Sequence, residues 1–322
     1  MSDQYLWDKT GQPDPEIQKL EELLHPLRHT RPLQMPRRRT NRWVGIAAGV
    51  ALLAAAGSSW FAIRASLPAW DVQRVAGAPR VGSSPLGGGG KLRLGQTLET
   101  DSSSRAVLDV ADIGELKIDP NTRLRISESK TGAHRISLEK GVIHAMIWAP
   151  PRNFVVDTPS STTIDLGCKY TLQVSPDGDG KVEVESGWVA FEWHGKESFI
   201  PQGAVCSTSR KSGPGIPWYL DAPDTLQQAL RRYQTRASDE DMIIILAEAR
   251  RKDAMTLWHL LGRVDVPSRI RVYEKLASLA PPPPGVTRDG VMRLASKDLD
   301  EWWNSLGLDD AAWWRKMERT LE

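Results

Sequence analysis

An unbroken run of uncharged residues, Trp43 to Ile63, constrains this chain more than any other feature. At about 1.5 Å of rise per residue, these twenty-one residues form a helix long enough to cross a bilayer core of roughly 30 Å. Trp43 and Trp60 stand near its two ends, where amphipathic rings favour the headgroup region. A buried core helix would carry polar interruptions, and a cleaved signal peptide would not usually follow about forty residues of folded-looking sequence. The run therefore predicts a single transmembrane helix.

The charges that flank this run predict its orientation. Basic residues crowd its N-terminal flank: Arg37, Arg38, Arg39 and Arg42. On the other side only Arg64 and Arg74 follow closely. Because positively charged flanks stay in the cytoplasm, we expect the N-terminus in the cytoplasm and everything after Arg64 on the other side of the membrane.

Composition and cysteine placement limit the partners. Lys and Arg total 42 against 40 Asp and Glu, a net charge of +2, so we expect no direct binding of nucleic acid. Both cysteines, Cys168 and Cys206, follow the predicted anchor, in a space where a disulfide can persist. A bridge between them is one interpretation and two buried free thiols are the other, because the spacing does not give the separation that decides.

The segment before the anchor, residues 1–42, predicts one short cytoplasmic helix. Asp14 can cap its free amides, and Pro15 suits the first helical position. Four apolar residues recur at helical spacing and form one stripe: Ile17, Leu20, Leu24 and Leu27. A helix of about thirteen residues cannot bury this stripe and is marginal alone in water. With Trp7 as an added apolar contact, we expect docking to a cytosolic protein, and a helix resting on the lipid is the alternative.

Residues 64–211, with a core of about 70–203, change to period-two alternation, which is typical of half-buried strands. The expected strands cover residues 106–110, 115–118, 123–126, 134–138, 154–156, 162–166, 170–174, 181–184 and 188–191. Turn sequences such as Asp119-Pro120-Asn121 and Glu139-Lys140-Gly141 separate them at about ten-residue intervals. Short strands at this spacing with no helix between them predict an all-β domain, an antiparallel sandwich or solenoid.

Residues 212–322 return to helical periodicity after the Gly- and Pro-rich stretch 212–217. The expected helices are Asp224–Thr235, Asp239–Arg251, Ala254–Leu261, Ser268–Leu279, Thr287–Leu294, Lys297–Leu306 and Asp310–Leu321. Ser238 with Asp241 three residues on has the arrangement of a capping box. The C-terminal region is therefore expected to be α-helical.

Six short motifs follow one another along the β-rich segment. The first has the pattern L-x-x-G-x-x-L-x-T and ends in Leu98-Glu99-Thr100, and the second is Asn121-Thr122-Arg123-Leu124, an asparagine, a small residue, an arginine and a leucine. The others are L-x-x-G at Leu138–Gly141, F-x-V-x-T at Phe154–Thr158, a stretch similar to L-G-T-x-F-x-V at Leu166–Leu172, and V-x-V-x-x-G-x-V at Val182–Val189. In this order the motifs resemble the FecR domain, the extracytoplasmic module of a family of bacterial sigma-factor regulators. At Cys168 this chain has cysteine in place of the family's threonine.

The resemblance implies a protein of the bacterial inner membrane, with its C-terminus in the periplasm. It implies control of an extracytoplasmic-function sigma factor, bound in the cytoplasm, by a signal that the outer domain receives from an unknown protein or polymer. Neither cysteine lies on the cytoplasmic side, so the His-Cys-Cys zinc set of some such regulators is not expected.

Catalytic motifs give no support to an enzyme. The six His are scattered, and no G-x-S-x-G, H-E-x-x-H or phosphate loop occurs in the sequence. Gly87–Gly90 is expected to be a flexible loop, because no Lys-Ser/Thr and helix follow it. We therefore expect no catalytic residue, cofactor or metal. A membrane-tethered binding module of the cell envelope, without a sigma-factor role, and a scaffold built on the helical region are the alternative functions.

Overall fold

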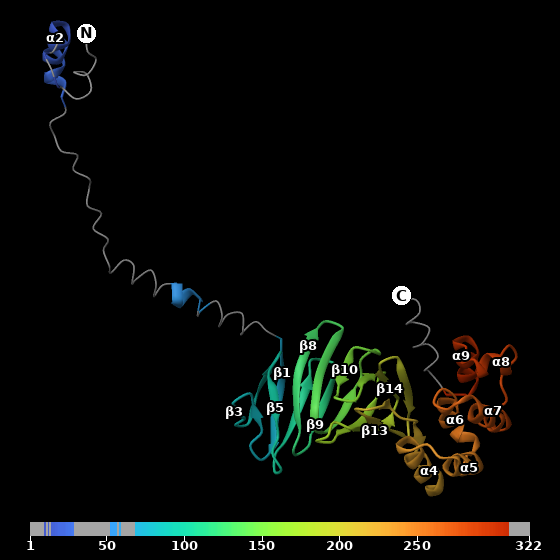
Figure 1. Cartoon of the computed structure of the whole chain (residues 1–322). Helices are drawn as coiled ribbons and strands as arrows, with labels where there is room; N and C mark the ends of the chain where they lie inside the picture. Colours follow the sequence, from blue (N-terminus) through green and yellow to red (C-terminus); the bar gives the residue numbers. More distant parts are fainter. Residues whose placement is uncertain are drawn as a thin grey trace. The chain divides into compact units, whose positions relative to one another are not determined.

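The computed structural model describes Thr10, Gln12 and residues 14–28, 52–56, 58 and 68–308. Its contacts divide the chain into two compact units, Met1–Arg64 and Ala65–Glu322 (Figure 1). Of the predicted anchor, Trp43–Ile63, residues 52–56 and 58 are helical and the rest lies outside the described residues. Among the residues described, no helix is both long and apolar enough to cross a membrane.

The first unit contains the helix that was expected before the anchor. Helix α2 spans Pro15–Leu24 and the 3-10 helix η1 spans His25–Leu27. Asp14 caps α2, since its Oδ1 accepts a hydrogen bond from the Glu16 N–H at 2.9 Å. The predicted cap and the predicted proline at the first position are confirmed, and Pro26 ends the α-helical hydrogen bonding because it lacks an N–H.

The β domain of the second unit consists of two sheets that share one long strand, β9 (Ala133–Ile147). Sheet A also contains β1 (Ala69–Ala76), β4 (Gly89–Arg93), β6 (Arg105–Val110), β7 (Gly114–Ile118), β12 (Lys169–Val174), β13 (Gly180–Ser186), β16 (Ala204–Ser209), β17 (Gly213–Pro214) and β18 (Trp218–Tyr219). Sheet B also contains β2 (Arg80–Val81), β3 (Ser84–Pro85), β5 (Thr97–Glu99), β8 (Arg123–Lys130), β10 (Phe154–Asp157), β11 (Thr162–Asp165), β14 (Trp188–Trp193) and β15 (Lys196–Pro201).

Strand β9 passes from one sheet to the other at Gly141. Up to Lys140 it pairs with β8 in sheet B, and from Gly141 onward it pairs with β12 in sheet A. Gly141 has a φ of +104°, which favours glycine, and its backbone lies against Thr122. The prediction that Glu139-Lys140-Gly141 is a turn between strands is wrong, because the chain bends here and the strand continues.

The side chains between the two sheets form the core of this domain. Leu108, Ile126, Tyr170 and Phe191 are fully buried, and the alternation along each strand places polar residues on the outside. All described strand pairs are antiparallel except β9 with β10. The predicted antiparallel all-β domain is confirmed, and its sheets, continuous through β9, form a half-barrel.

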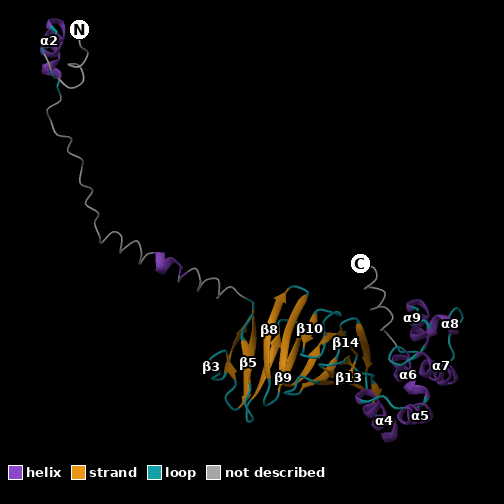
Figure 2. Ribbon diagram, in the orientation of Figure 1, coloured by secondary structure: helices purple, strands orange, loops and turns teal. Residues whose placement is uncertain are grey.

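The helical region follows at the end of the β domain near β13 and β14 (Figure 2). Its helices are α4 (Asp224–Thr235), α5 (Asp239–Glu248), η2 (Arg251–Asp253), α6 (Ala254–Leu261), α7 (Val266–Leu279), α8 (Arg288–Met292) and α9 (Ser296–Ser305). Helix α5 ends three residues earlier than expected because Arg250 and Asp253 form a capping box that starts η2. Helix α7 begins two residues earlier than expected, since Asp265 is its cap. The last expected helix, Asp310–Leu321, lies outside the described residues.

Candidate functional site

In the described part of the first unit, the apolar stripe of α2 and the following η1 is uncovered. The exposed fractions of Leu20, Leu24 and Leu27 are 61%, 53% and 78%. Ile17 is half-buried, and Leu23, which we did not assign to the stripe, is also exposed. Apolar side chains of this size on one helix face are typical of a surface that another molecule covers. Trp7 and the arginines Arg37, Arg38, Arg39 and Arg42 lie outside the described residues.

Two of the sequence motifs of the β domain meet at a hydrogen-bonded corner, which is formed by Thr100 and Thr122. Thr100 Oγ1 donates to the Asp119 carbonyl at 2.7 Å and accepts from the Thr122 N–H at 2.9 Å. Thr122 Oγ1 accepts from the Val142 N–H at 3.0 Å and donates to the Val142 carbonyl at 3.2 Å. Each hydroxyl thus satisfies backbone groups of another strand, which fixes β5, β8 and β9 together. These pattern residues fix the fold at this corner, and Thr100 and Thr122 also line the pocket beside it.

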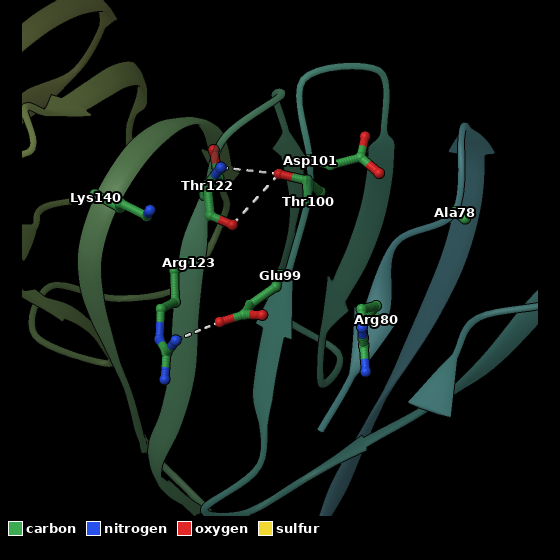
Figure 3. A pocket seen from close by; sticks show the side chains of 8 residues that line it. All are labelled: Ala78, Arg80, Glu99, Thr100, Asp101, Thr122, Arg123 and Lys140. Atoms are coloured by element: carbon green, nitrogen blue, oxygen red, sulfur yellow. Dashed lines mark hydrogen bonds and ion pairs between the residues drawn. The ribbon is translucent and has the colours of Figure 1, made fainter. Parts of the chain in front are cut away.

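A pocket of about 180 Å³ opens beside this corner (Figure 3). Its charged lining residues are Arg80, Glu99, Asp101, Arg123 and Lys140. Arg123 forms an ion pair with Glu99 inside the pocket, as Figure 3 shows. Hydrogen bonds from Ser103 and Ser104 hold the Asp101 carboxylate and lower the pKa of that exposed group. Glu99 and Arg123 therefore compensate one another, and they are two of the five charged residues that line the pocket.

Both cysteines are buried free thiols, and no disulfide joins them. Cys168 precedes Leu172 by four residues along β12, Leu172 pairs with Val182, and Val182 pairs with Cys206. At about 3.3 Å per residue and about 4.8 Å per strand spacing, the two Cα atoms lie about 16 Å apart. A disulfide spans at most roughly 7 Å between Cα atoms. Of the two interpretations drawn from the sequence, the disulfide is therefore wrong for this structure. The alternative, two buried free thiols, agrees with it.

Cys168 is instead paired with a buried carboxyl group. Its Sγ donates to Asp165 Oδ2 at 2.9 Å, and the Gly167 N–H donates to Asp165 Oδ1 at 2.7 Å. Burial raises the pKa of Asp165 to about 7, and burial with the neighbouring carboxyl raises the pKa of the Cys168 thiol well above its usual range. Such a thiol is neutral and unreactive, so this pair is a structural element that the sequence did not reveal.

On the outer face of sheet A the register brings together three residues that we had not connected. His144 Nδ1 lies 2.9 Å from Thr171 Oγ1, its direct partner in the β9–β12 pairing. His144 Nε2 lies 3.0 Å from Asp119 Oδ2. The side chains of His144 and Asp119 are 40% and 35% exposed on a sheet surface, which offers no enclosed site for a substrate. The hydrogen bonds that link Asp119, His144 and Thr171 have the arrangement of a catalytic triad. Because the three side chains lie on an open sheet surface, we interpret them as a chain of surface hydrogen bonds.

The helical region is fixed to the β domain by polar contacts along the edge strand β15. The Phe199 N–H donates to His259 Nε2 of α6 at 3.0 Å, so His259 Nδ1 carries the proton and donates to the Met255 carbonyl at 2.9 Å. Arg263 donates to the carbonyls of Glu197 and Pro214 at 2.9 and 3.1 Å. These bonds satisfy backbone groups that an open edge would leave unpaired.

Aromatic packing reinforces the same junction. The buried ring of Trp303 lies 4.7 Å from Trp258, 5.7 Å from Phe199 and 6.2 Å from Trp188, measured between ring centroids. Trp303 comes from α9, whereas Phe199 and Trp188 come from the β domain. The helices and this end of the half-barrel therefore share one core.

Three comparisons relate the chain to known proteins. Residues 96–190 match the family model described as "FecR protein". A search of curated proteins finds no match. Two crystal structures of a "putative anti-sigma factor" from Parabacteroides distasonis are similar at 14% identity and a TM-score of 0.35. The alignments cover 41% of this chain and 63% and 62% of those chains, so this chain spans less than two thirds of their length.

At this TM-score the two structures carry no argument about the activity of this chain. The family match stands on its own, and it covers strands β5 to β13 and part of β14. It includes the corner formed by Thr100, Thr122 and Gly141 and the turn that holds Asp165 and Cys168. The half-barrel of this protein therefore contains a FecR domain.

Proposed function

We propose that this chain is a single-pass regulator in the inner membrane of a bacterium, which binds an extracytoplasmic-function sigma factor through its N-terminal segment. The FecR match supports the regulatory class, because the family resemblance implies an outer domain coupled to a cytoplasmic sigma-factor contact. In this proposal the outer part, which contains the FecR domain, receives the signal and residues 1–42 hold the sigma factor.

The observation that carries the proposal is the uncovered face of α2. Leu20, Leu24 and Leu27 expose more than half of their surface, and none of the described residues of α2 is buried. Burying one leucine side chain stabilises an interface by roughly 1.5–3 kcal/mol, so this face supplies enough free energy for a specific partner. An inert stub would have no need of such a stripe.

The membrane part of the proposal is supported by the sequence. The uncharged run Trp43–Ile63 has the length of a bilayer span, and the Arg37–Arg42 cluster favours a cytoplasmic N-terminus. Reporter fusions after Asn41 and after Ser83 test it. A periplasm-dependent reporter is expected to be silent at Asn41 and active at Ser83, and the reverse pattern would refute this topology.

The sigma-factor contact is tested with the full chain in detergent. Each extracytoplasmic-function sigma factor of the same organism is coexpressed with it and assayed for copurification. We expect one of them to copurify in a stoichiometric complex. If none does, the regulator proposal should give way to a tethered envelope binding module that recognises a protein or polymer outside the cytoplasm.

A further inference from the structure

Strand β4 forms an open edge of the half-barrel. Among the described strands it pairs only with β1, and Gly89, Gly90 and Lys91 are exposed. The last strand of sheet B, β15, is covered by α6 through His259. The two ends of the domain therefore differ, since helices close one of them while β4 presents backbone at the other.

The hydrogen bonds between β1 and β4 show which backbone groups are free. Arg74 N donates to the Gly88 carbonyl at 2.7 Å, and Leu94 N donates to the Pro68 carbonyl at 2.9 Å. In an antiparallel pair, every second residue directs its backbone N–H and C=O groups toward the partner strand. Gly88 and Leu94 bond to β1 or its flank, so Gly89, Lys91 and Arg93 direct their N–H and C=O groups away from β1. The Arg93 N–H donates to Gln96 Oε1 at 2.8 Å. The N–H and C=O groups of Gly89 and Lys91 are thus available to a further strand.

The edge of β4 lacks the features that usually prevent an edge strand from pairing with another strand. A lysine on an edge strand normally discourages pairing, but Lys91 Nζ is held over β1 by Asp71 at 2.9 Å. The run Gly87–Gly90, which we expected to be a flexible loop, supplies the first residues of β4. A Cβ added at Gly87 or Gly88 would meet no atom within 4 Å, and at Gly89 the nearest atom would be 3.7 Å away. The fold has room for side chains at these three positions, whereas close approach of a second backbone favours glycine.

We propose that β4 binds an extended strand of a partner protein in which acidic and apolar side chains alternate. Lys91 and Arg93 lie on the outer face of β4, whereas Leu92 points into the core. An added strand would place its outward side chains beside these two cations and its inward side chains beside the core, which selects acidic and apolar residues in turn. Arg93 has no ion-pair partner among the described residues, so one positive charge is left uncompensated.

A second copy of this chain fits the edge less well. Antiparallel pairing of β4 with itself around Lys91 would set Lys91 of one copy directly opposite Lys91 of the other. Like charges directly opposite one another destabilise a strand pair. The charge pattern therefore selects a different, acidic strand, and this inference does not depend on the sigma-factor contact of α2.

The test uses the full chain in detergent and a fluorescent peptide of alternating glutamate and valine, about eight residues long, a usual strand length. Lys91→Pro removes one outward N–H and leaves the β1–β4 hydrogen bonds intact, and Lys91→Ala is the matched control that loses the same charge. Thermal unfolding checks that both variants are equally folded. We expect the peptide to bind Lys91→Pro about tenfold more weakly than Lys91→Ala, because strand addition depends on the lost edge hydrogen bond.

Hydrogen exchange locates the bound peptide, which is expected to protect the amides of Gly89 and Lys91. A lysine–valine peptide should bind the unaltered chain at least about tenfold more weakly than the glutamate–valine peptide. Equal binding by the two Lys91 variants, equal binding of the two peptides, or protection confined to other strands would overturn the proposal. Protection of β4 that rises with protein concentration in the absence of peptide would assign the edge to self-association and would also overturn it.

Discussion

Asp165 and Cys168 lie buried in one turn before β12, where a carboxyl group accepts a hydrogen bond from a thiol. This turn belongs to a motif of the family pattern, and the chain has cysteine at the position of the family's threonine. Both a thiol and a hydroxyl can donate a hydrogen bond to a carboxyl group. It could not decide between a disulfide and free thiols, because the separation of Cys168 and Cys206 depends on the register of three strands. Long-range register is a property of the fold and has no local signature.

Asp165→Asn should change the pH dependence of stability. Burial raises the pKa of Asp165 from 3.8 to about 7 in the folded chain, so the folded state binds the proton more tightly than the unfolded state. The resulting stabilisation is complete below pH 3.8 and is lost as the pH rises through about 7. Relative to Asp165→Asn, the unaltered chain should lose on the order of 1 kcal/mol per pH unit between about pH 5 and pH 7. Urea unfolding at several pH values measures it, and parallel curves for the two proteins would contradict the assignment.

At the scale of elements, sequence patterns predicted most strands and helices but missed β4, β15 and the second half of β9. Among the described residues, nine expected strands and seven expected helices (α2 and α4 to α9) are present, because their apolar spacing matches a strand or a helix with one apolar face. The second half of β9 was missed because Gly141 resembled the end of a turn. Strand β15 was missed because helices cover it, so its last four residues are all buried and alternation disappears. Strand β4 was missed because its glycines carry no pattern.

Gly141→Ala should destabilise the chain strongly, because it strains both the backbone and the corner. A Cβ there would lie 2.3 Å from Thr122 Cα, at a φ of +104°. Gly132→Ala is the matched control, since Gly132 also has a positive φ (+75°) but a Cβ there meets no atom within 4 Å. We expect a loss of about 1–2 kcal/mol in unfolding free energy for Gly132→Ala and about 3 kcal/mol or more for Gly141→Ala. Equal losses in chemical denaturation would mean that contact with Thr122 does not matter.

At the scale of the whole molecule, the chain combines an uncovered helix before a predicted anchor with a FecR domain whose end is covered by helices. The order of the first helix, the β domain and the helical region could be predicted from periodicity, and the anchor stays a prediction. The shared core around Trp303 could not, because it joins residues more than a hundred positions apart, such as Trp188 and Trp303. The helices behave as part of the β domain, since they complete its core and cover its edge.

Replacing Trp303 tests this shared core. Trp303→Ala should lower the unfolding free energy of the chain by about 3–5 kcal/mol, because the cavity opens between the helices and β15. Trp148→Ala is the control, since that ring is 62% exposed and its removal should cost about 0.5 kcal/mol or less. Limited proteolysis should release the helical region from Trp303→Ala sooner than from the control. Similar stability of the two variants would mean that the helices do not share the core.

The affinity of the cognate sigma factor for the full chain in detergent tests the central claim most directly. Leu20→Asp with Leu24→Asp places two negative charges on the exposed stripe, and Gln18→Asp with Lys19→Gln changes the net charge by the same amount away from it. Because each buried leucine contributes roughly 1.5–3 kcal/mol, the stripe variant should bind at least about a hundredfold more weakly than the unaltered chain. The control variant should bind within about threefold of it. Equal binding by the two variants, or unchanged binding by the stripe variant, would contradict a sigma-factor contact on α2.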